Sequence, residues 1–239
     1  MGKFSRHIKE AAERTLQYHD ELNPKIWDGD RLQNEVRTKL TIIAHTWAAF
    51  ANIPPEAIVD IILVGGNANY NYTPYSDIDL HLVVDLKKLP DCPELLDDYL
   101  KDKKQLWGMI HDIKIRDHDV ELYAQDKNTA YTKGQGVYSI KRGVWIVRPE
   151  KQEVDLDDPT LTAKVDQYIQ KIDTLISSNA DDSAFDEMKS KFREMRAAAL
   201  KQGGEFSLEN LVFKELRNQG HLDRMTQYIR SRQDKELSL

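Results

Sequence analysis

The stretch IILVGGNANYNYTPYSDIDLHLVV, residues 61–84, contains two different strand patterns separated by a pair of glycines. The first pattern is a run of apolar residues that ends at Gly65-Gly66, as in a strand buried on both faces. The second begins at Asp77 and alternates strictly between polar and apolar residues, as in a strand with one buried face. Because successive strand side chains point to opposite faces, we expect Asp77 and Asp79 on the same face.

Two carboxylates on one strand face indicate a cation site. The Cα atoms of Asp77 and Asp79 are expected roughly 6–7 Å apart, from the rise per residue of a strand. Their like charges repel unless a cation lies between them, and oxygen-only ligands suit Mg²⁺ or Mn²⁺. A Gly65-Gly66 turn can present backbone N–H groups to a phosphate. The stretch therefore predicts a divalent cation beside a phosphate site.

The segments before this stretch predict helices. Apolar residues recur roughly every four positions over Ser5 to about Leu22, and Pro24 and Gly29 end that pattern. A second helix is expected from Asp30, as its N-cap, to about Phe50. A strand over Val59–Val64 follows.

The segments after it predict a small sheet and then more helices. We expect a helix over Cys92–His111 and a strand over Val120–Ala124 that continues a piece at 113–115. A hairpin of 137–140 and 144–147 is expected to turn at Lys141-Arg142-Gly143. Helices should follow from about 161 to the C-terminus, with breaks at Gly203-Gly204 and Gly220. The pattern changes near residue 155, which predicts a core over 1–154 and a helical domain over 155–239.

The glycine pair, a ten-residue spacer and Asp77-Ile78-Asp79-Leu80 resemble the signature of the polymerase-β-like nucleotidyltransferase superfamily. The resemblance covers about residues 57–126. It implies an α+β fold with a small mixed, mostly antiparallel β-sheet flanked by helices, and a helical C-terminal bundle is common in such proteins. It also implies a transferase that moves a nucleoside monophosphate from an NTP to a hydroxyl group and releases pyrophosphate. ATP is the default donor.

The resemblance implies that Asp77 and Asp79 hold two divalent metals, Mg²⁺ or Mn²⁺, and that a carboxylate on a neighbouring strand completes the site. Glu121 is our choice for this third ligand because it lies deepest in its β-like run, flanked by two apolar residues. Asp119 is the reserve. The catalytic set is therefore Asp77, Asp79 and Glu121.

The expected nucleotide contacts come from two places. Gly65, Gly66, Asn67 and Ser76 belong to the motif, but residues 65–79 contain no Lys or Arg, where related proteins often have a basic residue. Residues 127–148 instead carry a net charge of +5, which leaves −11 for the rest of a chain whose net charge is −6. The predicted phosphate contacts from that window are Lys133, Lys141 and Arg142. Four tyrosines are candidates to stack on a base: Tyr70, Tyr72, Tyr75 and Tyr138.

Composition excludes several other classes of protein. The single cysteine, Cys92, allows neither a disulfide framework nor a zinc knuckle within one chain. No apolar run is long enough to cross a membrane, and the N-terminus lacks the apolar core of a signal peptide, so a cytoplasmic protein is expected.

The net negative charge favours a small-molecule or protein acceptor slightly over RNA. The alternative hypothesis is a catalytically inactive nucleotide- or partner-binding member of the same fold. In that case the apolar seam over 185–199 would engage a partner, and an oligomer through the C-terminal helices is compatible with the same seam.

Overall fold

The computed structural model describes residues 14–89 and 93–239. The chain divides into two compact units, which we describe separately. The strand-containing unit comprises residues 17–154 and 203–205. The helical unit comprises residues 14–16, 155–202 and 206–239. No helix in the described part of the chain is long and apolar enough to cross a membrane.

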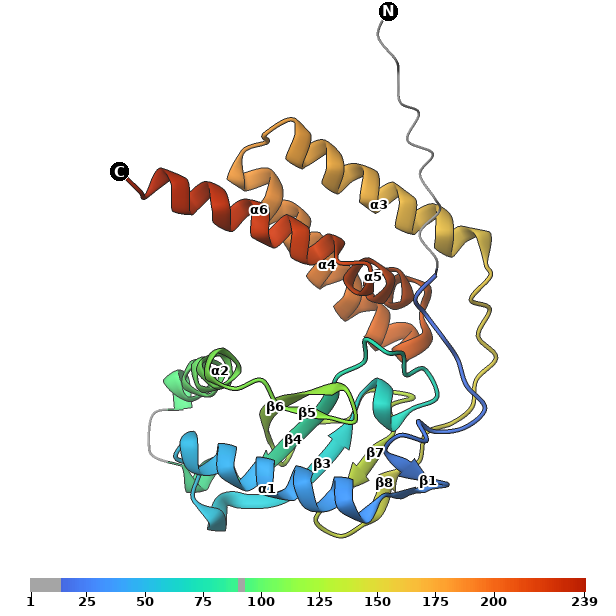
Figure 1. The fold of residues 1–239 in the computed structure, drawn as a ribbon, viewed down its shortest axis with the longest axis vertical. Coiled ribbons are helices and arrows are strands. Elements are labelled where there is room, and N and C mark those ends of the chain that lie inside the picture. Colours follow the sequence, from blue (N-terminus) through green and yellow to red (C-terminus); the bar gives the residue numbers. More distant parts are fainter. Residues whose placement is uncertain (1–13, 90–92) are drawn as a thin grey trace, which may run out of the picture. The chain divides into compact units, whose positions relative to one another are not determined.

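The strand-containing unit is built on a six-stranded mixed sheet (Figure 1). Its strand order is β5 (Lys114–Ile115), β6 (His118–Asp126), β4 (Ile78–Val84), β3 (Ile58–Val64), β7 (Val137–Ser139) and β8 (Val144–Val147). The β4–β6 pair is parallel, and every other neighbouring pair is antiparallel. Parallel neighbours need a crossover connection, and here it contains helix α2 (Pro93–Ile110). The expected mixed, mostly antiparallel sheet is thus confirmed.

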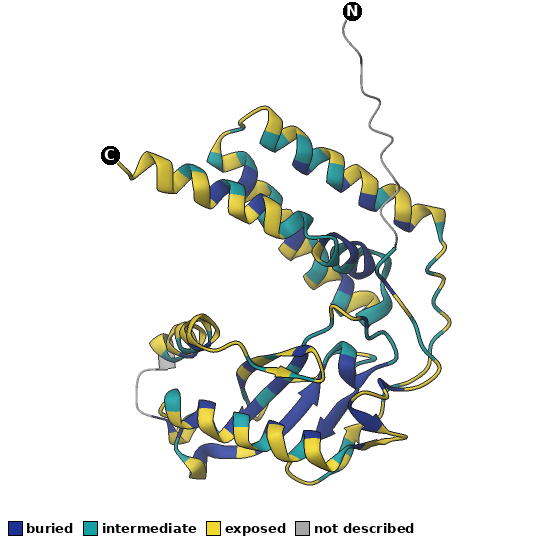
Figure 2. Cartoon of the chain, viewed as in Figure 1, coloured by how far each residue is buried: buried dark blue, intermediate teal, exposed yellow. Residues whose placement is uncertain are grey.

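One face of the sheet packs against α1 (Asn34–Phe50) and α2 in a single apolar core. Leu40 and Trp47 of α1 are completely buried, and Leu100 and Trp107 of α2 join the same cluster as Leu80 of β4. Figure 2 shows β3 and β4 buried along most of their length. The apolar positions of the alternating strand therefore form the core face and leave Asp79 on the other face.

The helical unit contains α3 (Pro159–Ser177), α4 (Asp182–Gly203), α5 (Leu208–Asn218) and α6 (His221–Glu236). The apolar seam of α4 packs within the chain. Phe192 contacts the ring of Tyr168 on α3 at 5.2 Å between centroids, and Phe185 contacts Tyr228 on α6 at 5.5 Å. Phe185 and Phe192 are both buried. The seam therefore forms part of this unit's own core.

The N-terminal helix prediction is wrong where the structure tests it. Residues 5–13 of that prediction lie outside the described residues, and residues 14–22 form no helix. The backbone amides of Thr15 and Leu16 donate instead to the carboxylate of Glu215 on α5, at 2.9 and 3.2 Å. The Glu215 carboxylate, which is distant in sequence, thus accepts the hydrogen bonds of these backbone amides.

The start of the next helix is also corrected. Helix α1 begins at Asn34 rather than after Asp30, because Arg31–Leu32 (β2) pairs with Trp27–Asp28 (β1) in a short hairpin. The Asp30 carboxylate accepts a hydrogen bond from Arg148 at 2.9 Å instead of capping the helix. Cys92, at the predicted start of α2, lies outside the described residues.

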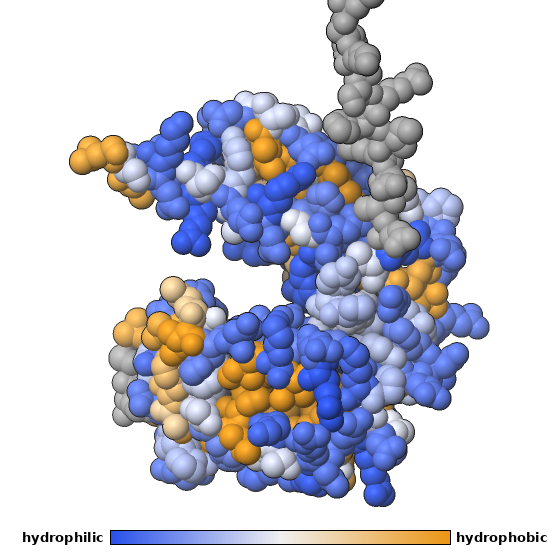
Figure 3. Space-filling model, in the orientation of Figure 1, coloured by the Kyte–Doolittle hydropathy of each residue, from blue (hydrophilic) through white to orange (hydrophobic). Residues whose placement is uncertain are grey.

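Figure 3 shows that apolar side chains gather in one patch on the visible face of the strand-containing unit, among mainly polar surroundings. Helix α1 contributes both buried and exposed apolar residues. Leu40 is 0% exposed, whereas Ile42 on the same helix is 54% exposed. These two positions therefore offer a matched test of which face of α1 holds the core.

We predict that Leu40→Ala lowers the free energy of unfolding by about 2–5 kcal/mol, because it leaves a cavity in the core. Ile42→Ala should change it by no more than about 0.5 kcal/mol. Urea unfolding followed by circular dichroism measures both. Equal losses for the two variants would contradict the assigned packing face.

Candidate active site

The structure brings the glycine pair and the second aspartate into direct contact. Val64, the last residue of β3, pairs with Asp79 of β4, so Gly65 leaves the sheet beside the Asp79 side chain. A Cβ atom added to Gly65 would lie 1.7 Å from Oδ2 of Asp79. Gly65 also has φ +77°, a conformation that other residues rarely adopt. Only glycine therefore allows the Asp79 carboxylate to lie against this turn.

Gly66 and Ser76, at the two ends of the connection, also meet. Gly66 begins a short 3₁₀ turn (Gly66–Ala68), and a Cβ added to it would lie 3.1 Å from Ser76 Oγ. The same hydroxyl accepts a hydrogen bond from the backbone N–H of Thr73 at 2.9 Å. The motif residues Gly65, Gly66, Ser76 and Asp79 are thus gathered at one end of β3 and β4.

A network of buried polar side chains forms hydrogen bonds to the backbone next to this turn. Asn67 is fully buried, and its Nδ2 donates to the carbonyl oxygens of Ser76 and Asp77 at 3.1 and 3.0 Å. Its Oδ1 accepts a hydrogen bond from Asn23 Nδ2 at 2.8 Å. The side-chain amide of Asn67 is therefore used inside the protein, where it has a structural role, and the nucleotide contact of Asn67 stays a prediction.

His118 completes the network. Its Nδ1 lies 2.7 Å from the carbonyl oxygen of Ser76, and its Nε2 lies 2.9 Å from Asn23 Nδ2. The carbonyl can only accept and the amide nitrogen can only donate, so the geometry requires the proton on Nδ1. Sequence analysis missed both Asn23 and His118, because their partners are 42 or more residues away along the chain.

The carboxylates share one face of the sheet. Asp79 on β4 pairs in register with Glu121 on parallel β6, which places the two side chains next to each other. However, Glu121 Oε1 lies 3.2 Å from Nζ of Lys104 on α2. The reserve residue, Asp119, is paired with Lys114.

The carboxylates near the glycine turn are the residues that would hold a divalent metal ion. Asp77 and Asp79 supply the hard oxygen donors that Mg²⁺ or Mn²⁺ prefers. Within residues 14–89 and 93–239, however, no group of three or more His, Cys, Asp and Glu side chains is arranged to hold a metal ion. The Glu121 carboxylate is instead paired with Lys104, and the set of Asp77, Asp79 and Glu121 stays a prediction.

His81 lies on the same face, two residues beyond Asp79. Its Nδ1 is 2.6 Å from Oε1 of Gln125 on β6, and its ring lies 5.2 Å from that of Tyr123. Burial lowers the pKa of His81, and the hydrogen bond to Gln125 partly opposes that change. The imidazole is thus held in place between two strands next to the carboxylates.

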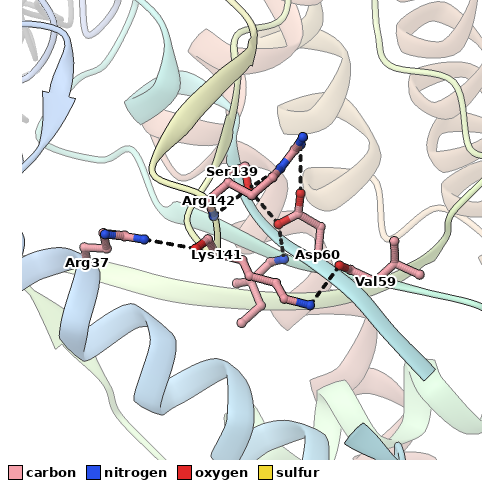
Figure 4. Close-up of polar contacts among 7 residues, drawn as sticks. Arg37, Val59, Asp60, Ser139, Lys141 and Arg142 are labelled. Atoms are coloured by element: carbon pink, nitrogen blue, oxygen red, sulfur yellow. Dashed lines mark hydrogen bonds and ion pairs between the residues drawn. The ribbon is translucent and has the colours of Figure 1, made fainter. Parts of the chain in front are cut away.

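Two of the predicted phosphate contacts lie elsewhere (Figure 4). Arg142 Nη2 donates to Oδ2 of the buried Asp60 at 3.0 Å, and Lys141 Nζ donates to the carbonyl oxygen of Val59 at 3.2 Å. Val59 and Asp60 lie near the start of β3, whereas Gly65 follows its end, roughly 16 Å from Asp60 at the rise of a strand. The structure therefore does not bring Lys141 and Arg142 to the glycine turn.

The third predicted basic residue, Lys133, belongs to a loop that does reach the turn. Gly136 donates its backbone N–H to Oδ1 of Asn69 at 3.1 Å. A Cβ added to Gly136 would lie 2.1 Å from the carbonyl oxygen of Ala68. The loop that carries Lys133 is therefore packed directly against the 3₁₀ turn after Gly65.

The four tyrosines proposed as base-stacking residues have different environments. Tyr138 is buried, with its ring 5.0 Å from Trp27 and 5.1 Å from Trp145, so it cannot stack on a ligand. Tyr72 already stacks on His19 at 3.9 Å. Tyr70 lies under Lys151, and Tyr75 is 58% exposed. Tyr138 is thus excluded as a base-stacking residue, and Tyr75 is the most exposed of the four rings.

Comparisons with known proteins do not identify the chain. No protein-family model and no curated protein matches it. The solved structure of a STING-associated CdnE c-di-GMP synthase from Capnocytophaga granulosa is similar at 13% identity with a TM-score of 0.22. The match covers 80% of this chain and 62% of that one, so the chain spans less than two thirds of its length. At this TM-score the likeness does not establish a shared fold.

The contact between Gly65 and Asp79 makes a direct prediction. Gly65→Ala should lower the free energy of unfolding by about 1–3 kcal/mol for a backbone conformation (φ +77°, ψ −162°) that is nearly restricted to glycine, and by about 1–3 kcal/mol more because Asp79 must move. Gly29→Ala is the matched control. Gly29 also has a positive φ, +59°, but nothing lies within 4 Å of an added Cβ, so only a backbone cost of about 1–2 kcal/mol applies.

Thermal and urea unfolding of both variants measure the difference. If Gly65→Ala were no more destabilising than Gly29→Ala, the close approach of the Asp79 carboxylate to the turn would be refuted.

Proposed function

We propose that this protein is a metal-dependent nucleotidyltransferase, which transfers a nucleoside monophosphate from an NTP, ATP by default, to a hydroxyl acceptor. The observation that carries the proposal is the contact between the Gly65-Gly66 turn and Asp79. Residues separated along the chain by a polar connection converge at one end of β3 and β4. A phosphate held at the turn would therefore lie beside a carboxylate pair.

The donor side of the site follows from this arrangement. The backbone N–H groups of Gly65 and Gly66 would donate hydrogen bonds to the phosphates. Asp77 and Asp79 would hold a divalent cation, which supplies neutralisation of phosphate charge and a lower pKa for an attacking hydroxyl. Lys133 would supply positive charge from the adjoining loop.

The reaction that this site would support is a displacement at the α-phosphorus. The acceptor oxygen forms a bond to that phosphorus while the bond to the bridging oxygen of pyrophosphate breaks. The residues around the turn would contribute by positioning the donor, since the buried Asn23–Asn67–His118 network fixes the backbone that carries Ser76 and Asp77.

The acceptor is proposed from charge alone. The net charge of −6 disfavours a long nucleic acid, so we favour a small molecule or a protein hydroxyl.

One observation favours a second candidate, a nucleotide-binding protein without catalysis. The third carboxylate, Glu121, is ion-paired with Lys104 and does not join Asp77 and Asp79. The two candidates differ in product: the enzyme releases pyrophosphate from an NTP with a suitable acceptor, whereas the binding protein leaves the NTP intact.

We predict that ATP binds in the presence of Mn²⁺ and that Asp77→Asn or Asp79→Asn weakens this binding at least roughly tenfold, as expected for loss of a metal ligand. Equilibrium dialysis with labelled ATP measures it. Asp85→Asn is the matched control. Asp85 follows the other end of β4, and Lys127 holds the pKa of its carboxyl below the usual range through a 2.8 Å hydrogen bond.

The control variant loses the same charge at the opposite end of β4 and should bind ATP like the wild type. ATP binding that survives both Asp77→Asn and Asp79→Asn would contradict the proposed site. Absence of ATP binding with every divalent cation would contradict the proposed function.

A further inference from the structure

Lys104 is a cation built into the face that carries the candidate metal ligands. It extends from α2 to β6, where its Nζ lies 3.2 Å from Oε1 of Glu121 and 5.8 Å from the ring centroid of Tyr123. The Lys104 side chain is 33% exposed and that of Glu121 is 53% exposed. The pair is thus accessible to water and to an incoming ion.

The position of this pair relates it to Asp79. Since Asp79 and Glu121 are register partners on parallel strands, their side chains occupy neighbouring places on one face. The ammonium group therefore lies beside the Glu121 carboxylate, on the face of the sheet that also carries Asp79.

An exposed ion pair of this kind is weak, because water screens it and two long side chains must be held in place. A divalent cation attracts a carboxylate more strongly than an ammonium group does at the same distance. Glu121 can therefore exchange Lys104 for a divalent cation at little cost. The ion pair with Lys104 therefore accounts for a Glu121 carboxylate that lies next to Asp79 but is held by an ammonium group.

We propose that Lys104 is a positioning residue that competes with a divalent cation for Glu121 and so sets the metal affinity of the site. The proposal rests on the proposed function, because it assumes a cation at Asp77 and Asp79. With Lys104 in place, the site binds a divalent cation through the two aspartates. Glu121 becomes a ligand only when the ammonium group moves away.

The test is a titration of Mn²⁺ into the full chain, without nucleotide, followed by isothermal titration calorimetry. Lys104→Met should bind Mn²⁺ up to about fivefold more tightly, because a bound cation no longer has to break the exposed Lys104–Glu121 ion pair. Lys104→Arg keeps the charge and should retain the wild-type affinity.

The matched control is Lys103→Met. Lys103 is the next residue on α2, but its Nζ lies over the rings of Phe50 and Tyr99, at 5.1 and 5.3 Å. The Lys103→Met variant removes the same positive charge at a place away from the carboxylates, so it should change the Mn²⁺ affinity by less than about twofold. A Lys104→Met variant that binds Mn²⁺ no more tightly than Lys103→Met would overturn the proposal.

A double variant shows whether the effect acts through Glu121. In a Glu121→Gln background, Lys104→Met should give no further tightening, and an undiminished gain there would also overturn the proposal.

Asp77→Asn separates this inference from the function on which it rests. Mn²⁺ binding that persists in this variant refutes the proposed site itself. Binding that is lost in Asp77→Asn, with Lys104→Met equal to the wild type, refutes only the role of Lys104.

Discussion

The contact between the Gly65 backbone and the Asp79 carboxylate is the constraint on which the rest of the site depends. A side chain at position 65 would occupy the space of Oδ2 of Asp79, and the backbone there has a positive φ. The antiparallel register of β3 and β4 produces the contact, because Val64 pairs with Asp79 as the last residue of its strand. Strand pairing, turn conformation and carboxylate position are therefore one feature of the fold.

Two further features fix this contact in place. The apolar alternation of β4 buries Leu80 and Leu82 against the helices, so Asp79 and His81 are forced to the opposite face. Below the turn, Asn67 and its hydrogen-bonded neighbours satisfy the backbone carbonyls of Ser76 and Asp77. A buried polar network of this kind is stabilising only when its members are satisfied, which makes the turn rigid.

Local periodicity was sufficient to predict the central strands but not the contacts between distant segments. β3 was predicted from a continuous apolar run, β4 from a period of two, β6 from a short β-type run, and the hairpin turn from Gly143, all of which are local signals. The hydrogen bond from Arg148 to Asp30, and the pairing of Arg142 with Asp60, join residues far apart in sequence. A local pattern holds no information about such partners. Lys104 was missed for the same reason, because only the α2 crossover brings it to Glu121.

The central claim is that a divalent cation binds where Asp79 meets the glycine turn. Paramagnetic broadening of backbone amide NMR signals by Mn²⁺ tests it directly, since the effect falls steeply with distance from the ion. A second location is available for comparison, a cavity of about 460 Å³ beside α1 that is lined by Arg37, His45 and Lys141. We expect broadening first at residues 65–66 and 77–79. Broadening confined to the cavity beside Lys141, or absent throughout, would contradict the account.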